Sequence, residues 1–499
     1  MKRLGVFSLV LAAVLCGSCY RKSNVSIDEE SDAGDSDGDA DSDADSDSDG
    51  DTDGDADSDG DGDTDTWPNG DTAPGGYGDV MDVCWATSFF VEGEESWVWI
   101  KDMTAFGDGS SVVTGGFQGT LVLGEGEPDE TVLEPTAGDS VTEMFLARFD
   151  ADGQLVWARR DGGATVVQGH GMAVLPDDSI VATGHYNDDI VLGAGETHET
   201  ELESGGLFLA RYYPNGQLAW ARDEGGNNTG PSFGVHEDGH FVVSGDGMGE
   251  ETFGAGQQNE TTLSWGGPVG EWAITEPGML FWASYESDGT LRWARSADSD
   301  FADSNSSAAA LADGSYAVAG RFYAALAFGH GSDDEIVLWA PTDSDDSTLT
   351  FSPAMFLARI SDDGELLWAL GSKSGFGNSA MATKAATLSG DRILVGGSFT
   401  GAVNFGLGAS EETWLVASGE GEPFAAIYDM DGNPEWVTRL GTDWNGGHAA
   451  AMDGLEDDTF LVAGSFSGTA TFQIGGDQEP IQIQAQGERD GFLMHVCPW

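Results

Sequence analysis

The stretch EMFLARFDADGQLVWARR at residues 143–160 contains the pattern that decides the fold. Phe145 lies in an apolar run, Gly153 ends a polar turn eight residues later, and Trp157 lies in a second apolar run twelve residues after the Phe. Apolar runs on either side of an Asp-Gly turn predict a β-hairpin. The same Phe, Gly and Trp spacing recurs in four later stretches: Phe208/Gly216/Trp220, Phe281/Gly289/Trp293, Phe356/Gly364/Trp368 and Phe424/Gly432/Trp436.

A second hairpin precedes each of these, as in GMAVLPDDSIVATGHY at 171–186, and a short crossing segment lies between the two hairpins. Each unit therefore supplies four main strands, and no long helix is expected. Tandem four-stranded units bury their sheet faces by stacking on one another, which is typical of the blades of a β-propeller. Six copies of this upstream hairpin and five complete copies of the Phe-Gly-Trp hairpin predict an all-β fold, a six-bladed β-propeller.

The C-terminal stretch DGFLMHVCPW at 490–499 begins as the Phe-Gly-Trp hairpin does and stops before the last strand of that hairpin. An incomplete blade would leave a sheet edge with unpaired backbone N–H and C=O groups. The stretch MDVCWATS at 81–88 has the Trp-Ala pair of the missing strand, so Trp85 is expected to act as the sixth repeat tryptophan. We therefore expect the N-terminal and C-terminal strands to pair and close the ring.

The N-terminus has the form of an export signal. A short basic start is followed by an apolar run from Leu4 to Leu15, which is too short to span a bilayer as a helix. The sequence LCGSC at 15–19 resembles the lipobox of bacterial lipoproteins, which implies lipid attachment at Cys19; the alternative is an ordinary cleaved signal peptide. The expected organisation is a signal peptide at 1–18, a lipid anchor and linker at 19–79, and the propeller at 80–499.

Two further cysteines are expected to lie near the ring closure. With Cys16 in the signal and Cys19 lipidated, Cys84 and Cys497 remain, on strands that would pair about three residues out of ideal register. Export permits their oxidation to a disulfide, and the alternative is two buried free thiols. Because the closed loop is so long, such a disulfide would contribute about 4–5 kcal/mol in the chain-entropy model.

The chain is strongly acidic, with 88 Asp and Glu against 19 Lys and Arg and a net charge of −69. This charge argues against nucleic acid and anionic membranes as partners. From Asp35 to Asp65 every second residue is Asp, and such a segment is expected to be a disordered, extended tether. Weak Ca²⁺ association is expected there, but the EF-hand pattern is incomplete, so no specific metal site and no cofactor are predicted.

The segments GSFTGAVNFGLG, MFLARISDDGELLWAL and AVLPDDSIVATG resemble the SBBP-type β-propeller repeats of large secreted bacterial proteins. The resemblance covers roughly residues 80–499 and implies a propeller fold and an exported location. It implies no catalytic residues, because the family shares none. The name of the family suggests seven blades, whereas the repeats here number six.

One motif has the form of a metalloprotease signature: HEDGH at 236–240 fits H-E-x-x-H, which needs a helix. Because this segment aligns with a hairpin turn, we expect a polar turn with two exposed histidines instead. The six repeat tryptophans are expected to pack in the core or between blades. The inter-unit loops and crossing segments should ring one end of the channel, the usual ligand face. Aromatic insertions there make three residues candidate contact sites: Trp265, Trp272 and Trp339.

These patterns favour a monomeric outer-membrane lipoprotein, facing the periplasm or the exterior, that binds a protein or glycan partner. It would contact the membrane through its lipid alone. The first alternative is a calcium-dependent surface adhesion protein. The second is a propeller enzyme of the hydrolase, lyase or quinoprotein type, for which the sequence offers no identifiable catalytic residue.

Overall fold

The computed structural model describes residues 81–499, with gaps at 137, 139–140, 164–165, 204, 224–228, 248, 255, 270–277, 287–288, 301–305, 342–350, 376, 407–412, 418–420, 443–447, 456, 473, 475–479 and 499. The chain divides into two units, Met1–Thr66 and Trp67–Trp499, and every described residue belongs to the second. The expected signal peptide, Cys19 and the acidic tract lie outside the described residues.

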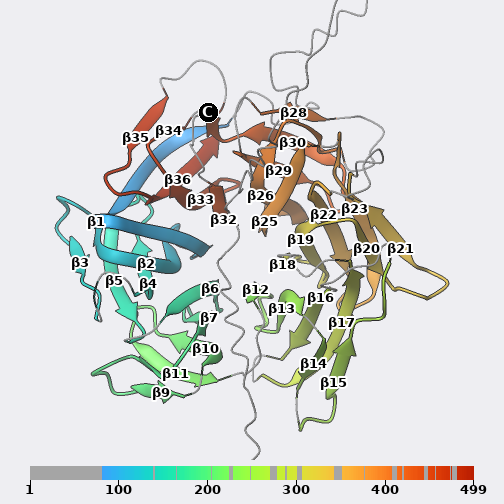
Figure 1. The fold of residues 1–499 in the computed structure, drawn as a ribbon, viewed down its shortest axis with the longest axis horizontal. Coiled ribbons are helices and arrows are strands. Elements are labelled where there is room, and N and C mark those ends of the chain that lie inside the picture. Colours follow the sequence, from blue (N-terminus) through green and yellow to red (C-terminus); the bar gives the residue numbers. More distant parts are fainter. Residues whose placement is uncertain are drawn as a thin grey trace, which may run out of the picture. The chain divides into compact units, whose positions relative to one another are not determined.

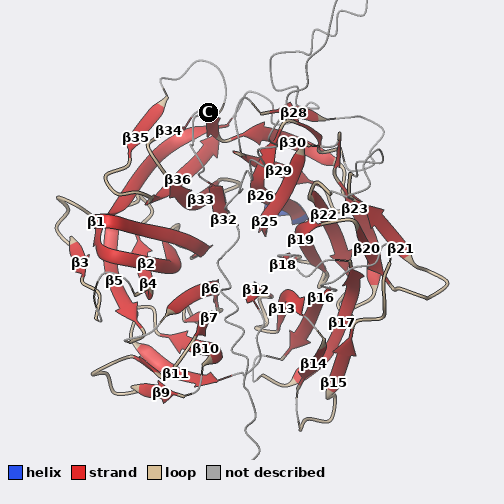
Figure 2. Cartoon of the chain, viewed as in Figure 1, coloured by secondary structure: helices blue, strands red, loops and turns tan. Residues whose placement is uncertain are grey.

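The described residues form β-strands joined by turns, with one short 3₁₀ segment, η1 (Ser389–Asp391) (Figure 2). The prediction of an all-β fold is confirmed. The main strands belong to antiparallel modules of four, and in the first five modules chain order is also spatial order.

The bounds of the main strands follow the repeat. Module one contains β1 (Met81–Ala105), β2 (Ser111–Leu123), β4 (Glu143–Phe149) and β5 (Leu155–Asp161). Module two contains β6 (Val167–Val174), β7 (Ile180–Tyr186), β10 (Gly206–Tyr212) and β11 (Leu218–Asp223). Module three contains β12 (Thr229–Val235), β13 (Phe241–Gly247), β16 (Gly278–Tyr285) and β17 (Leu291–Ser299).

The later modules repeat this order. Module four contains β18 (Ser306–Ala310), β19 (Tyr316–Phe322), β22 (Ala354–Ile360) and β23 (Leu366–Gly371). Module five contains β25 (Ser379–Leu388), β26 (Arg392–Thr400), β29 (Glu422–Tyr428) and β30 (Pro434–Arg439). Module six contains β32 (His448–Gly454), β33 (Phe460–Phe466) and β36 (Asp490–Pro498), and its fourth strand is the N-terminal half of β1.

The crossing segments, which follow the second strand and precede the third strand of each module along the chain, form short outer strands. They are β3 (Thr131–Leu133), β8 (Ile190–Leu192) with β9 (Thr200–Leu202), β14 (Glu250–Phe253) with β15 (Thr261–Ser264), β20 (Ala325–Phe328) with β21 (Ile336–Trp339), β27 (Ala402–Asn404) with β28 (Trp414–Val416), and β34 (Thr469–Phe472) with β35 (Ile481–Gln484). Two very short strands, β24 (Lys373–Ser374) and β31 (Gly441–Thr442), pair with β27 and β34.

Strand β1 joins the two ends of the described chain. Its first half pairs with β36 and its second half with β2, so modules six and one form a single curled sheet of eight strands. Figure 1 shows the blue β1 beside the red C-terminal strand β36. The first strands of successive modules also contact one another in the order β1, β6, β12, β18, β25 and β32, and β32 contacts β1.

The apolar core lies between neighbouring modules. One cluster, for example, combines Leu394 and Ile427 of module five with Met452, Val462 and Phe492 of module six. Corresponding clusters lie between modules six and one, one and two, three and four, and four and five. The cluster between modules two and three is much smaller: among the described residues it contains four buried side chains, Ala173, Val181, Leu209 and Phe233.

A buried polar cluster connects several of the first strands. Lys384 of β25 places its Nζ 2.6 Å from Oδ1 of Asp102 on β1, and both side chains are buried. The other carboxylate oxygen of Asp102 accepts a hydrogen bond from the backbone N–H of Met172 on β6. One carboxylate therefore connects modules five, one and two.

Candidate functional site

A recurrent contact joins neighbouring modules at four junctions. The repeat tryptophan on the fourth strand lies against the turn glycine of the following module, and these glycines have φ between 78° and 85°. A Cβ added at Gly153 would lie 2.6 Å from the ring of Trp85, and one at Gly364 would lie 2.8 Å from the ring of Trp293. Only glycine fits such a position, because it needs both a left-handed backbone and close approach of a ring.

The same tryptophans donate hydrogen bonds to the turn that they cover. The indole Nε1 donates to a backbone carbonyl oxygen two residues before the glycine, in the pairs Trp85–Ala151, Trp157–Pro214, Trp293–Asp362 and Trp368–Met430. The prediction that the repeat tryptophans pack between units holds for these four. Trp436 is also buried and packs against Phe460.

Trp220 differs from the other five. Its side chain is 36% exposed, and the atoms nearest to a Cβ at Gly289 of the next module belong to the guanidinium of Arg222, 3.9 Å away. The guanidinium of Arg222 also lies over the Trp220 ring, 5.4 Å from its centroid. The contact between ring and glycine that fills four other junctions is therefore replaced here.

A cleft of about 290 Å³ lies at this junction of modules two and three, and we call it the Trp220 cleft. Its apolar lining comes from Leu175, Val181 and Leu209 of module two and Phe241 of module three. Its polar lining consists of Asp177, Arg211, Arg222 and Asp238, and Gly289 completes it. The small core cluster at this junction accounts for the space, because fewer apolar side chains fill it.

Asp177 is held in a fixed position at one wall. In the β6–β7 turn its Oδ1 accepts hydrogen bonds from the backbone and hydroxyl of Ser179, and its Oδ2 lies 2.5 Å from Nη2 of Arg211. These hydroxyl and backbone hydrogen bonds and the Arg211 charge outweigh slight burial and lower the pKa of Asp177. Asp177 is therefore an ionised hydrogen-bond acceptor at neutral pH.

Asp238 lies across the cleft in the β12–β13 turn, where its Oδ1 accepts a hydrogen bond from the backbone N–H of His240. That bond lowers the pKa of Asp238, and the side-chain contact with His240 acts in the same direction. The side chains of Asp177 and Asp238 are 62% and 72% exposed, so both carboxylates are fixed yet open to a ligand.

The β12–β13 turn is the HEDGH segment, and the predicted turn is confirmed: His236 N–H donates to the His240 carbonyl, and Gly239 N–H donates to the carbonyl of His236. The prediction that both histidines are exposed is wrong. Their rings stack on each other with centroids 4.1 Å apart, and His236 packs edge-on against Tyr316 of the next module. His236 is buried and the His240 side chain is 13% exposed.

Beside the histidines, Asp362 of module four accepts two hydrogen bonds from Arg292 and lies 3.5 Å from Nε2 of His240. Arg292 and Asp362 thus form an ion pair between modules three and four, and the imidazole of His240 lies beside it. Within the described part of the chain, no group of three or more His, Cys, Asp or Glu side chains has the arrangement of a metal site.

Sequence reasoning did not find the cleft. The signal available was the departure of unit three from its neighbours. Ser284 stands where units one, two and four have the arginine of FLAR, and His240 stands where units one, two, four and six have Ser or Thr. The cleft also lies at the hairpin-turn end of the modules, opposite to the loops and crossing segments expected to form the ligand face.

The aromatic candidates lie elsewhere. Trp339 on β21 is 55% exposed and Trp265 is half-buried after β15, and neither lines the cleft. Trp272 lies outside the described residues, as does Cys19.

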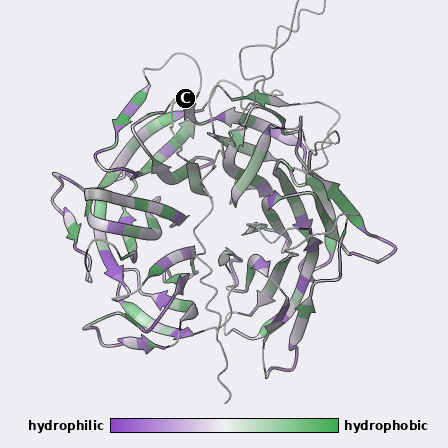
Figure 3. Cartoon of the chain, viewed as in Figure 1, coloured by the Kyte–Doolittle hydropathy of each residue, from purple (hydrophilic) through white to green (hydrophobic). Residues whose placement is uncertain are grey.

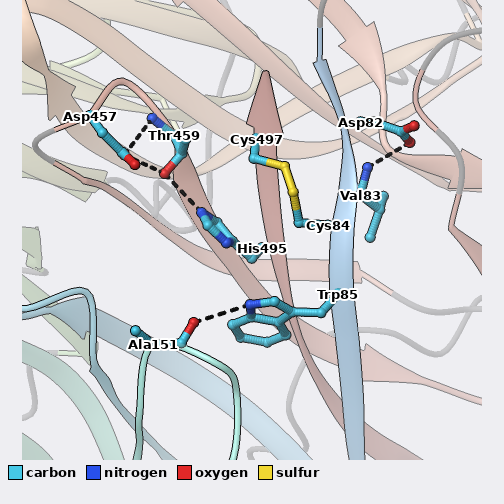
Figure 4. Close-up of a disulfide and its surroundings, with 9 residues drawn as sticks. All are labelled: Asp82, Val83, Cys84, Trp85, Ala151, Asp457, Thr459, His495 and Cys497. Carbon is cyan, nitrogen blue, oxygen red and sulfur yellow. Dashed lines mark hydrogen bonds between the residues drawn. A yellow bond between two sulfur atoms is a disulfide. The ribbon is translucent and has the colours of Figure 1, made fainter. Parts of the chain in front are cut away.

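Cys84 and Cys497 form a disulfide with Cα atoms 6.0 Å apart, which confirms the predicted pair (Figure 4). In the ladder between β1 and β36, Val83 faces Val496 and Trp85 faces His495, so Cys84 is an extra residue at a bulge. Asp82 is the residue opposite Cys497. This bulge resolves the register mismatch expected from the sequence, because it brings Cys84 next to Cys497.

The described residues include no helix that is long and apolar enough to cross a membrane. No known protein family and no curated protein sequence match the chain. Among solved structures, it is similar to a protein of unknown function from Dyadobacter fermentans DSM 18053, with a TM-score of 0.42 and 10% sequence identity. That match covers 84% of this chain and 99% of the other.

Proposed function

We propose that the chain is a lipid-anchored, six-bladed β-propeller of the cell envelope that binds a ligand in the Trp220 cleft. The single observation that carries the binding function is the exposure of Trp220. Four junctions between modules are filled by a tryptophan on a glycine, whereas at this one the ring lines an open cleft with four charged side chains. Exposed aromatic rings with a few fixed polar groups are typical of ligand sites.

Several features support a closed ring of six blades. β1 serves both module six and module one, and β32 contacts β1 as the other first strands contact their neighbours. The disulfide between Cys84 and Cys497 joins the strands that meet there. Closure removes the open sheet edge that would otherwise invite aggregation.

The proposed anchor is a lipid on Cys19, and the acidic tract from Asp35 to Asp65 would hold the propeller away from the outer membrane. This proposal rests on the sequence alone. Labelling with an alkyne fatty acid should mark the wild-type chain and not a Cys19→Ala variant, and the variant should leave the membrane fraction. A Cys19→Ala chain that is still labelled and membrane-bound would contradict the anchor.

Binding in the cleft can be tested with defined probes. We would measure ligand-observed NMR on the full-length chain with methyl glycosides, benzamidine and benzoate, which represent neutral, cationic and anionic classes. The matched variants are Trp220→Ala in the cleft and Trp339→Ala, which removes an exposed tryptophan elsewhere. The proposal expects at least one probe to bind the wild type and Trp339→Ala but not Trp220→Ala. If no probe shows this dependence on Trp220, the cleft is not a ligand site of the proposed kind.

A further inference from the structure

The geometry of the Trp220 cleft points to a neutral pyranose sugar as its occupant, with the apolar face of the sugar ring on Trp220 and its hydroxyl groups on Asp177 and Asp238. This inference rests on the proposed function and gives the ligand its chemical class. A neutral pyranose has an apolar C–H face and a rim of hydroxyls that both donate and accept hydrogen bonds.

The lining is amphipathic in the way such a ring requires. Trp220 supplies a large flat surface that is 36% exposed, and Leu209 and Phe241 continue the apolar surface. The polar groups include both acceptors, the carboxylates of Asp177 and Asp238, and donors, the guanidinium groups of Arg211 and Arg222. A purely apolar ligand would bury these charged groups without hydrogen bonds, which is unfavourable.

The lining has two carboxylates and two guanidinium groups, so these four side chains sum to no net charge. The net charge of −69 on the chain disfavours an anion. A cation would compete with Arg211, which already forms an ion pair with Asp177. A neutral ligand rich in hydroxyl groups can donate to the carboxylates without displacing this ion pair. The contribution of each hydroxyl is strengthened because its partner is charged.

The site is also prepared for its ligand. Ser179 and Arg211 fix Asp177, and the backbone of His240 fixes Asp238, so these acceptors need little ordering on binding. A volume of about 290 Å³ is near the lower end of small-molecule sites, which start at about 300 Å³. The cleft therefore suits a monosaccharide or disaccharide unit, free or at the end of a glycan.

The test compares sugars of similar size that carry different charges. Titration calorimetry on the full-length chain would use methyl hexopyranosides and N-acetylglucosamine as neutral sugars, glucuronate as an anion and glucosamine as a cation. We expect a neutral sugar to bind most tightly. Trp220→Ala should weaken that binding by about tenfold or more, as expected for loss of an aromatic stacking partner.

Two conservative variants address the hydroxyl contacts without altering the size of the site. Asp177→Asn and Asp238→Asn should each weaken binding of the neutral sugar several-fold, since a charged acceptor becomes a neutral amide. Asp129→Asn, which changes an exposed carboxylate on module one, should leave it unchanged. Circular dichroism of each variant reports whether it folds. If Trp220→Ala does not fold, the two Asp→Asn variants still test the proposal.

The outcomes separate the two proposals. If benzamidine or benzoate binds in a Trp220-dependent way and no neutral sugar does, the sugar inference is overturned and the cleft remains a ligand site. Tighter binding of glucuronate or glucosamine than of every neutral sugar also overturns it. If no probe binds with any dependence on Trp220, both proposals fail.

Discussion

The indole Nε1 of Trp85 donates a hydrogen bond to the carbonyl oxygen of Ala151, 3.2 Å away (Figure 4). The same bond joins Trp157 to Pro214. Trp85 comes from the segment that precedes the first complete unit, yet it covers Gly153 as Trp157 covers Gly216. The junction between modules six and one is thus built by the same contact as a junction within the repeat. An N-terminal strand that completes the last module also locks it to the first.

The contact between tryptophan and glycine predicts unequal effects of one substitution at equivalent turns. Gly153→Ala adds a methyl group that would lie 2.6 Å from Trp85, whereas the nearest atoms at Gly289 are 3.9 Å away. Both alanines carry the cost of a left-handed backbone, about 1–2 kcal/mol. Only Gly153→Ala also overpacks a junction, at about 1–3 kcal/mol more. Urea unfolding followed by tryptophan fluorescence should therefore show the larger loss of unfolding free energy for Gly153→Ala. Equal losses would mean that the Trp85 ring moves aside at no energetic cost.

The disulfide between Cys84 and Cys497 closes a loop of 413 residues in sequence separation. We expect a reductant to lower the free energy of unfolding by about 2–5 kcal/mol, the usual range for a native disulfide. The Cys84→Ala/Cys497→Ala double variant is the control: it should start at the reduced stability and not respond to reductant. Peptide mapping without reduction should recover the two cysteines joined. If the wild type has the same free energy of unfolding with and without reductant, the disulfide contributes no stability.

The ion pair between Lys384 and Asp102 is buried, so removing one partner should cost more than removing both. Lys384→Met leaves a buried carboxylate without its cation and should destabilise the protein by about 3–5 kcal/mol. The Lys384→Met/Asp102→Asn double variant should lose less, because the amide oxygen can still accept from the Met172 backbone. Thermal unfolding of the three proteins completes the comparison. A double variant that is less stable than Lys384→Met would contradict this account.

Much of the fold could be predicted because the repeated positions hold residues, such as glycine in turns, whose structural role is known. Gly153 and Gly289 were placed in turns by spacing, and both have the positive φ that such turns need. The Trp-Ala pair and the spacing to the next hairpin assign Trp85 to a fourth strand, and that strand pairs with β36. The disulfide follows from this pairing, and the bulge at Cys84 is the one that precedes the repeat tryptophan in the other five modules.

The site could not be predicted because it depends on packing between units. The local sequence of Trp220, LAWARD, is similar to that of Trp157, LVWARR. The exposure of Trp220 arises from a junction with few apolar partners and from the position of Arg222. The burial of His236 likewise depends on Tyr316, which lies 80 residues later and in another module. Repeat patterns identify what units share, and these two features are differences between units.

The stacked histidines predict a pH dependence of stability. Burial lowers the pKa of His236 from 6.5 to about 4; the neighbouring His240 and Arg292 act in the same direction, while Asp238 and Asp362 oppose them. Between about pH 6.5 and 4 the unfolded chain therefore binds a proton at this residue that the folded chain does not. The stabilisation is complete above pH 6.5 and is lost as the pH falls towards 4.

Replacing the imidazole should remove this component. His236→Phe keeps a ring against Tyr316, and His236→Gln keeps a polar side chain, but neither titrates in this range. The free energy of unfolding, measured in urea at steps from pH 7.5 to 4.5, should fall less steeply with acidification in both variants than in the wild type. Comparing slopes rather than absolute values separates the lost titration from any loss of packing. If both variants keep the wild-type slope, His236 binds protons equally in the folded and unfolded chains over this range, and a buried neutral His236 imidazole is ruled out.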